Sequence, residues 1–420
     1  MKWNKWLPMA MVLVLAVGVL AACGPQRDAD QTQKEAGKEE KPKELVIWAN
    51  KDSDELASTK KLAKRYQEKS GIKVKVVGQD MLKMQDKLNL DGPAGKGPDL
   101  VTWPHDRIGE AVITGLIQPI EVSQDVVDQY SESSIKALTY KGKLYGLPKV
   151  TESIALYYNK DLIKEPPKTW EELVEYAKEN TEPSQKKYGL LFEGENFYYD
   201  YFLFRAYGGY IFKEENGKFN TQKVGLNNEG SKKAGIEIEE LYKNKLIPKG
   251  IKADTVNGLF KEGKVAMVIN GPWALSDYRG AKVNFGVAPL PKINGENAQA
   301  FIGVKGWYLS NFSKHKEAAT ELIQFMTSKE SLKSRYQDTG DIPPHKDLIE
   351  DPVIKEDPAV KAFAEQAGYG NPMPNIPEMG QVWEPINNAL AFIAQGKQKP
   401  EKALDDAVKL IEEKIKAQKQ

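Results

Sequence analysis

Cysteine and histidine are scarce in this sequence of 420 residues. The single cysteine, Cys23, cannot form a disulfide within the chain, and the three histidines, His105, His315 and His345, are too scattered to suggest a metal site. None of the motifs H-E-x-x-H, C-x-x-C, G-x-S-x-G and G-x-x-x-x-G-K-[ST] occurs, and no constellation for nucleophilic catalysis is visible. We therefore predict a protein that is not an enzyme and uses no metal or cofactor.

An excess of either charge is absent as well. The chain has 60 Lys and Arg against 59 Asp and Glu, a formal charge of +1. Removing residues 1–22, for the reason given next, takes away Lys2 and Lys5 and leaves 58 basic against 59 acidic residues, a formal charge of −1. A balanced surface gives no electrostatic reason to expect nucleic acid or an anionic lipid as partner.

The N-terminus has the pattern of an export signal. Lys2 and Lys5 precede an apolar run over residues 9–20, and the run ends in Ala21-Ala22-Cys23. A basic start, an apolar middle and small residues at the cut are typical of a secretory signal peptide, and the run is shorter than the roughly 20 residues of a membrane span. We predict a signal peptide over residues 1–22.

Cys23 itself predicts a lipid anchor. Leu20-Ala-Ala-Cys23 resembles the bacterial lipobox, in which the cysteine is lipidated and becomes the first mature residue. An exported protein with a chance cysteine at the cleavage site is the alternative, but a lone thiol in such a protein has no other evident role. We expect Cys23 to hold the protein at the extracellular face of the cell membrane.

The segment after Cys23 is rich in charge and has no large apolar residue up to Pro42. Such a segment cannot bury enough surface to offset the entropy of an ordered chain. Residues 23–43 are therefore predicted to be a disordered tether between lipid and folded body, although the same composition would also fit a plain disordered tail.

The folded body starts with an alternation of strands and helices. Apolar strands are predicted at 45–48, 72–76 and 99–103, with helical spacing over 56–70 and 82–88 between them and a turn at 92–98. This order is typical of an α/β fold with a parallel sheet, in which ligands bind at the carboxyl ends of the strands. The segments 48–52 and 103–107, rich in polar and aromatic residues, follow two of these ends.

A second unit begins after Thr151 and Glu152. Thr169 followed by Glu172 is a capping-box pattern that starts a helix, and residues 265–269 read as a buried strand followed by Asn270-Gly-Pro-Trp273. Amphipathic spacing predicts further helices over 314–326 and 401–417.

Aromatic residues next to carboxylates and amides are the distinctive feature of both units. Glucose has an apolar face that packs on flat aromatic rings and a rim of hydroxyls that needs fixed donors and acceptors. Such clusters would suit a neutral polyol, whereas a phosphate would need a basic cluster. Any single Trp is more often a core residue, and we assign Trp48 and Trp170 to the core. The clusters are Trp103/Asp106/Arg107, Glu195/Phe197/Tyr198, Asn270/Trp273 and Trp383/Glu384.

Over residues 44–420 the chain resembles the maltose/maltodextrin-binding proteins of ATP-driven sugar importers. The segments that carry the resemblance are 96–100 with 103–107, 157–162, 166–172, 208–210 with 215–218, 269–273, and 373–377 with Trp383. Together with the lipobox and the tether they make the chain similar to the cyclodextrin/maltodextrin-binding lipoproteins of Gram-positive bacteria.

The resemblance implies a two-lobed α/β fold of the type II periplasmic-binding-protein kind, with mixed sheets flanked by helices and a hinge of several strands. We expect the N-lobe to comprise residues 44–150 and 305–350, and the C-lobe residues 151–304 and 351–420. The chain would cross between the lobes at about 151–154, 301–305 and 351–356.

The resemblance also implies which residues touch sugar. The expected set is Asp52, Trp103, Asp106 and Arg107 of the N-lobe, Glu152 at the hinge edge, and Glu195, Phe197, Tyr198, Trp273, Trp383 and Glu384 of the C-lobe. Ser53, Phe197, Glu384 and Asn387 depart from the residues usual in the family, a lysine, a tyrosine, a tyrosine and an arginine. Because these changes remove polar contacts and keep aromatic surface, we expect longer or cyclic maltodextrins to be preferred over maltose.

The expected partners are a maltodextrin or cyclodextrin and the permease subunits of an ABC importer, and the protein is expected to be a monomer. Two alternatives stay open. A glycoside hydrolase also needs aromatics and two carboxylates, and a binding protein for a peptide or a metal chelate could use the same fold.

Overall fold

The computed structural model describes residues 41–216 and 218–419, and Lys41–Gln420 form one compact unit. The predicted signal peptide, the lipidation at Cys23 and most of the predicted tether lie outside the described residues. Within them, no helix is both long and apolar enough to cross a bilayer.

One sheet organises the part of the molecule that we call the N-lobe. Its strand order is β14-β13-β3-β1-β2, and β6 also pairs with β13. These strands are β1 Glu44–Asn50, β2 Lys73–Gln79, β3 Leu100–Pro104, β6 Gly146–Glu152, β13 Phe301–Leu309 and β14 Asn371–Pro372. Because β13 runs antiparallel to β3 and β6, the sheet is mixed rather than parallel as the first three strands alone suggested.

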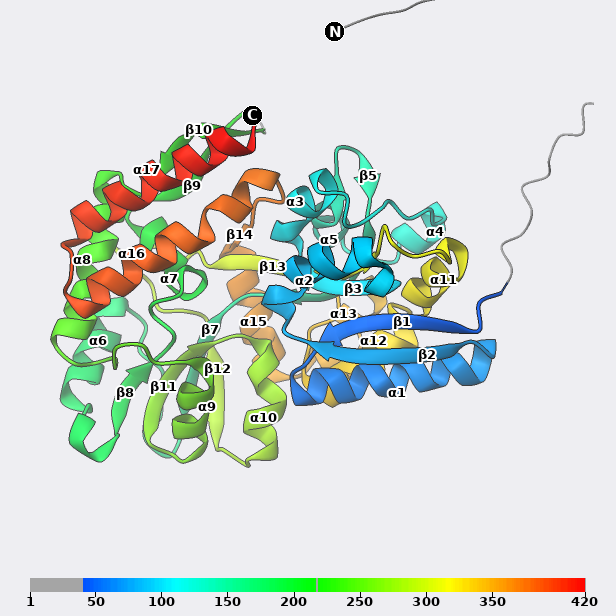
Figure 1. Cartoon of the computed structure of the whole chain (residues 1–420). Coiled ribbons are helices and arrows are strands. Elements are labelled where there is room, and N and C mark those ends of the chain that lie inside the picture. Colours follow the sequence, from blue (N-terminus) through cyan, green and yellow to red (C-terminus); the bar gives the residue numbers. More distant parts are fainter. Residues whose placement is uncertain (1–40, 217, 420) are drawn as a thin grey trace, which may run out of the picture. The chain divides into compact units, whose positions relative to one another are not determined.

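Helices pack against this sheet, and α1 lies beside α12 (Figure 1). Helix α1 ends at Ser70 because Gly71 takes the left-handed conformation that glycine accepts without strain. The helices here are α1 Ser53–Ser70, α2 Met84–Asp91, α3 Ile108–Ile113, α4 Gln124–Val127, α5 Glu132–Ala137, α11 Lys316–Met326, α12 Lys329–Thr339, α13 Lys346–Ile349 and α14 Pro352–Lys355, with the 3₁₀ turns η1 Met81–Lys83 and η3 His105–Arg107 and the hairpin β4 Thr139–Tyr140 and β5 Lys143–Leu144.

The segment predicted as a turn at 92–98 is instead a π-helical turn, η2 Gly92–Lys96, that continues α2. Gly95 has φ 70° there, and a Cβ at Gly92 would lie 2.2 Å from the ring of Phe312. Glycine is therefore needed at position 92 for close packing, which local turn patterns do not reveal.

A second sheet, of order β12-β7-β11-β8, organises the C-lobe. Its strands are β7 Ala155–Asn159, β8 Tyr188–Leu191, β11 Val265–Asn270 and β12 Phe285–Ala288, and β9 Tyr210–Glu215 and β10 Lys218–Gly225 form a separate ladder. The helices are α6 Trp170–Glu179, α7 Phe197–Ala206, α8 Glu229–Lys243, α9 Ala253–Lys261, α10 Leu275–Gly280, α15 Pro358–Tyr369, α16 Trp383–Gln395 and α17 Pro400–Gln418, with the 3₁₀ turns η4 Pro183–Gln185, η5 Pro272–Ala274 and η6 Pro377–Gln381. Helices α16 and α17 pack together on α8 (Figure 1).

The predicted start of α6 is confirmed. Thr169 Oγ1 accepts from the N–H of Glu172 at 3.2 Å, and the Glu172 carboxylate accepts from the N–H of Thr169 at 3.2 Å. Both partners of the capping box are thus in place at the N-terminus of this helix.

The chain passes between the two sheets more than once. It leaves β6 through Ser153 and Ile154 to enter β7, returns from β12 to β13, and passes from α14 to α15, which packs on β12. Several covalent connections therefore join the lobes, while their exact boundaries stay a prediction.

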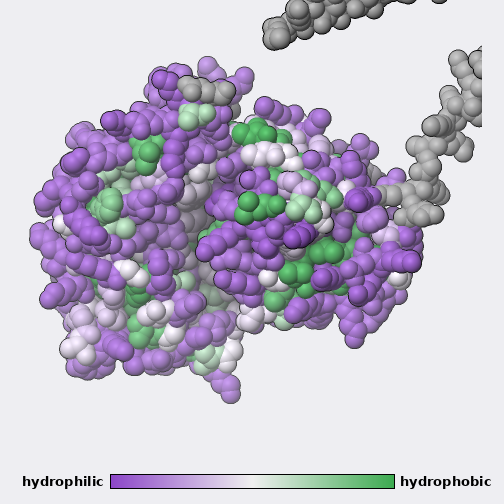
Figure 2. Space-filling view, in the orientation of Figure 1, coloured by the Kyte–Doolittle hydropathy of each residue, from purple (hydrophilic) through white to green (hydrophobic). Residues whose placement is uncertain are grey.

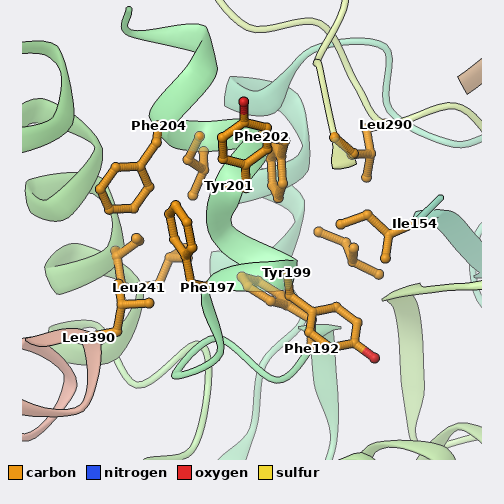
Figure 3. Packing of buried hydrophobic residues seen from close by; sticks show 14 of the residues in the cluster. Ile154, Phe192, Phe197, Tyr199, Tyr201, Phe202, Phe204, Leu241, Leu290 and Leu390 are labelled. Carbon is orange, nitrogen blue, oxygen red and sulfur yellow. The ribbon is translucent and has the colours of Figure 1, made fainter. Parts of the chain in front are cut away.

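Each lobe has its own apolar core. In the C-lobe an aromatic cluster surrounds α7, where Phe197, Phe202 and Phe204 are fully buried (Figure 3). Trp170 belongs to this cluster and Trp48 to a core of the N-lobe, with 2% and 4% of their surfaces exposed. The assignment of both tryptophans to the core is confirmed.

Candidate functional site

A cavity of about 450 Å³ lies where the N-lobe meets the C-lobe. The surface is hollowed between the lobes (Figure 2). The volume is within the range of small-molecule sites. Aromatic and ionisable side chains of both lobes line it, among them Asp52, Glu55, Asp106, Arg107 and Lys305, Glu152 at the end of β6, and Tyr198, Tyr199, Trp273 and Trp383.

Seven of the residues predicted from the sequence come together in this cavity. They are Asp52, Asp106, Arg107, Glu152, Tyr198, Trp273 and Trp383. The first and the last of them, Asp52 and Trp383, are more than 300 positions apart in the sequence. The folding of both lobes brings all seven to one place. The remaining four predicted residues lie elsewhere and need correction.

Trp103 and Phe197 are core residues rather than parts of the wall. Trp103 is 1% exposed and stacks on Tyr308, with ring centroids 5.4 Å apart and planes at 22°. Phe197 is fully buried, and its ring packs edge-on against Phe204 at 5.2 Å. The next residue of α7, Tyr198, takes the place at the cavity, because successive helical residues point in different directions.

Glu195 and Glu384 have other partners. The Glu195 carboxylate accepts from the N–H of Gly250 at 2.5 Å and thereby fixes a neighbouring loop. Glu384 lies on the exposed side of α16, where its carboxylate pairs with Lys414 of α17. Neither side chain lines the cavity, so neither is kept as a candidate sugar contact.

The loop before η5 holds Trp273 in a fixed position. Gly271 is tied on both sides: its N–H donates to Asn270 Oδ1 at 2.9 Å, and its carbonyl accepts from the Tyr157 hydroxyl at 2.7 Å. The indole of Trp273 lies directly over Gly271, where a Cβ would come within 2.1 Å of the ring. Glycine at 271 is therefore what allows the ring to lie where it does.

Asp106 and Trp383 form a contact between the lobes. The indole N–H of Trp383 donates to Asp106 Oδ2 at 2.9 Å, and Arg107 Nε lies 3.9 Å from the same oxygen. Burial raises the pKa of Asp106 to about 6, against the lowering effect of Arg107 and of the Trp383 hydrogen bond. Asp106 therefore holds its proton to a higher pH than an exposed aspartate does.

His105, next to this contact, is committed to the backbone. Its Nδ1 accepts from the N–H of Val304 at 3.1 Å, so its Nε2 carries the hydrogen that faces the Met373 carbonyl at 2.9 Å. Burial lowers the pKa of His105 to about 4. The ring is a neutral strut between η3, β13 and the segment after β14.

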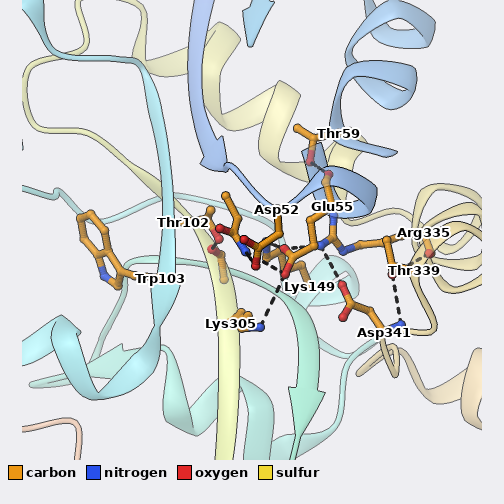
Figure 4. Close-up of polar contacts among 12 residues, drawn as sticks. Asp52, Glu55, Thr59, Thr102, Trp103, Lys149, Lys305, Arg335, Thr339 and Asp341 are labelled. Atoms are coloured by element: carbon orange, nitrogen blue, oxygen red, sulfur yellow. Dashed lines mark hydrogen bonds and ion pairs between the residues drawn. The ribbon is translucent and has the colours of Figure 1, made fainter. Parts of the chain in front are cut away.

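A network of buried charges borders the cavity through Glu55 and Lys305 (Figure 4). Glu55 is at its centre, with Arg335 Nη2 at 2.7 Å and Lys149 Nζ at 3.3 Å, and Arg335 also pairs with Asp341 at 2.7 Å. Burial alone would raise the pKa of Glu55, but the surrounding cations outweigh it and hold the pKa well below its usual range. Asn50 Nδ2 joins the network to the cavity wall, donating to Glu55 at 3.1 Å and to Asp52 at 2.9 Å.

The sequence model of the bacterial extracellular solute-binding proteins matches residues 61–362 of the chain. The chain belongs to this family. As an extracellular solute-binding protein it is 40% identical to a galactooligosaccharide-binding protein of Bacillus subtilis, over 99% of both chains. It is 34% identical to a maltooligosaccharide ABC transporter solute-binding lipoprotein of Streptococcus pneumoniae, over 99% of this chain and 98% of the relative.

A solved structure agrees with this assignment. A cyclo/maltodextrin-binding protein in complex with maltotetraose is 58% identical to this solute-binding protein, with a TM-score of 0.77 over 91% of this chain and 100% of the other. The two-lobed α/β fold expected from the sequence is confirmed by this likeness. The family and these relatives are binding proteins.

The chemistry of the cavity suits a neutral, hydroxyl-rich solute. Carboxylates, amides and cations line the cavity together with the aromatic rings, and the cations Arg107 and Lys305 both have carboxylates beside them. A phosphate would need unpaired cations. Among the described residues, no group of three or more His, Cys, Asp or Glu side chains is placed to hold a metal ion.

Sequence reasoning missed several residues of the site in this solute-binding protein. Asn50, Glu55 and Lys305 line the cavity floor, and Tyr199 and Asn387 line its C-lobe side. For Lys305 a signal existed: it is the one charged residue in the strand sequence of β13, and a buried charge needs a partner. Asn50 lies in the segment 48–52 at a predicted strand end, and Asn387 stands where the family usually has an arginine, although neither was assigned to the site. Glu55 and Tyr199 give no such signal, because their neighbours come from distant segments.

Proposed function

We propose that this solute-binding protein binds maltodextrins, linear and cyclic, in the cavity between its lobes and delivers them to the permease of an ABC importer. The observation that carries the proposal is the 58% identity to a cyclo/maltodextrin-binding protein crystallised with maltotetraose, together with a cavity lined by Tyr198, Trp273 and Trp383. The aromatic rings would pack on glucose faces, and Asp52, Asp106, Arg107 and Glu152 would bond to hydroxyls.

A panel of sugars tests the proposal. A ligand that binds only the folded protein raises its melting temperature, so maltotetraose and a cyclodextrin should both raise it. A galactooligosaccharide of equal length is the decisive comparison, because one relative is a galactooligosaccharide-binding protein. A larger shift with the galactooligosaccharide than with maltotetraose would replace the proposed solute.

The preference for longer or cyclic maltodextrins is part of the proposal. Ser53 lies beside Asp52 and offers no cation to a terminal sugar, and the aromatic rings favour solutes with many glucose faces. Titration calorimetry should give weaker binding for maltose than for maltoheptaose. Equal affinities would remove the preference and leave the proposed solute class intact.

Binding without cleavage is also proposed for this chain. Asp106 has the raised pKa of a general acid, but its carboxylate is held by Trp383 and Arg107 inside the site. Prolonged incubation with maltoheptaose should leave the sugar intact by chromatography. Shorter products that disappear in an Asp106→Asn variant would make the protein a hydrolase.

We further propose that the protein acts as a monomer attached to the membrane by a lipid on Cys23. Labelled palmitate should enter the wild-type protein in a bacterial host and be absent from the Cys23→Ala variant. Release of the unmodified wild-type protein into the medium would contradict the anchor.

A further inference from the structure

Lys305 is a buried cation on the floor of the cavity. Its side chain is 5% exposed, and its Nζ lies 2.9 Å from Glu152 Oε2 and 3.8 Å from Glu55 Oε1. Burial alone would lower the pKa of Lys305, but the carboxylates of Glu152 and Glu55 outweigh it and raise the pKa above its ordinary value. The ammonium is therefore charged at neutral pH and has carboxylate partners on the N-lobe side.

The ammonium also faces an aromatic ring of the other lobe. Its Nζ lies 5.3 Å from the ring centroid of Trp273, which η5 supplies. A cation this close to an indole is attracted to the ring, most strongly where water is excluded. Lys305 thus links the charge network of the N-lobe to a ring that the C-lobe contributes to the cavity.

A second lysine of the same network provides an internal comparison. Lys149 is also buried, pairs with Glu55 at 3.3 Å, and lies 4.8 Å from the ring centroid of Trp307. Trp307, however, is a core residue with 1% of its surface exposed, and Lys149 does not line the cavity. The two lysines share burial, a contact with the Glu55 carboxylate and a ring contact. They differ in the ring that they face and in the Glu152 carboxylate, which pairs with Lys305.

We propose that Lys305 is a positioning residue of the sugar site, an inference that rests on the proposed function. It holds the Trp273 indole and the Glu152 carboxylate in their binding orientations before a solute arrives, while Asn50 does the same for Asp52. A ring and a carboxylate that are already ordered lose less side-chain freedom on binding, so affinity is higher. Lys305 acts through these neighbours rather than by contact with sugar.

The test compares Lys305→Met with Lys149→Met, since each variant replaces a buried lysine with an uncharged side chain of similar shape. Calorimetry with maltotetraose should show about tenfold weaker binding for Lys305→Met, the factor expected when a fixed aromatic contact is lost. Lys149→Met should lower the melting temperature and change affinity less than about twofold. Lys305→Arg, which keeps the cation, should restore most of the affinity.

A double-mutant cycle with Trp273→Ala identifies the partner. The effect of Lys305→Met should be smaller in the Trp273→Ala background, because the ring is gone and only the Glu152 carboxylate is left for Lys305 to position. An effect of unchanged size in that background, or equal losses of affinity in Lys305→Met and Lys149→Met, would overturn the inference. If Lys305→Met does not fold, the same cycle is run on Lys305→Gln, which also removes the cation and leaves the proposed sugar contacts unchanged.

A readout without sugar separates this inference from the proposed solute. The fluorescence emission of Trp273 is obtained by subtracting the spectrum of the Trp273→Phe variant from the spectrum of the same protein with Trp273 in place. It should shift in Lys305→Met and stay the same in Lys149→Met. The proposed function would be refuted if the wild-type protein did not bind maltotetraose. The positioning role would be refuted if the Trp273 emission did not shift in Lys305→Met.

Discussion

At the scale of single residues, the buried carboxyl of Asp106 makes the stability of the protein depend on pH. Asp106 combines burial with a hydrogen bond from the other lobe, and the pKa of its carboxyl rises from 3.8 to about 6. The folded carboxyl therefore holds its proton more tightly than the unfolded one. Its favourable contribution to stability is complete below pH 3.8 and is lost as the pH rises through about 6.

The Asp106→Asn variant should reveal this loss. Asparagine cannot ionise, so the stability of the variant relative to wild type should increase by about 2–3 kcal/mol between pH 4 and pH 7. Denaturant unfolding at several pH values measures it, with the exposed Asp405→Asn as control. Parallel pH profiles for wild type and Asp106→Asn would contradict the raised pKa.

The two tryptophans of the cavity should matter for affinity. Trp273→Ala or Trp383→Ala is expected to weaken maltodextrin binding by about 1–3 kcal/mol, because each removes a large aromatic contact. Trp170→Ala is the matched control, since that indole is buried in the core and should cost stability and not affinity. A loss of thermal stability without a loss of affinity in all three variants would mean that Trp273 and Trp383 are core residues and not sugar contacts.

Individual residues also show which features of the site could be predicted from the sequence and which could not. Four of the strands and the cap at Thr169 followed from local patterns, and the site roles of Trp273 and Trp383 followed from the family resemblance. Trp103 and Phe197 were misplaced because both lie among aromatic neighbours, where only the packing of the whole lobe decides which ring faces the core. The network of Glu55 and Arg335 joins residues 280 positions apart, a pairing that no local pattern contains.

At the scale of elements, the loop from β11 into η5 shows how backbone geometry places a side chain. Strand β11 is buried throughout and ends at Asn270, so Gly271 must both turn the chain and leave room for the Trp273 indole. The hydrogen bonds of Gly271 to Asn270 and Tyr157 keep the loop in that form. The requirement for glycine comes from the ring and not from an unusual φ, which is −99°.

Gly271→Ala tests this placement. The new methyl group would collide with the indole and displace it, so maltotetraose should bind about tenfold more weakly, the effect of a lost aromatic contact. Gly258→Ala on α9 is the control, because no atom lies within 4 Å of a Cβ there. Unchanged affinity in Gly271→Ala would mean that the indole position is unimportant for binding.

At the scale of the whole molecule, the lobes are joined by several chain passages and bridged by side chains on both sides of the cavity. A solute that touches both lobes at once stabilises the closed arrangement. The hydrogen bond of Trp383 to Asp106, and that of Ser276 on α10 to Asp54 on α1, connect the lobes directly.

Solution scattering should detect the closure. Saturating maltotetraose is expected to reduce the radius of gyration of the protein, because the closed state is favoured by contacts to both lobes. Sucrose at the same concentration serves as the control and should leave it unchanged. Calorimetric binding of maltotetraose with no change in scattering would mean that the lobes do not move.

The hydrogen bond between Trp383 and Asp106 has one more consequence. An indole has a single donor, and here that donor is already satisfied inside the protein. Trp383 can therefore contact a solute only through the face of its ring and cannot distinguish the stereochemistry of individual hydroxyls. Discrimination between epimers of the same ring shape must come from the carboxylates and amides around it.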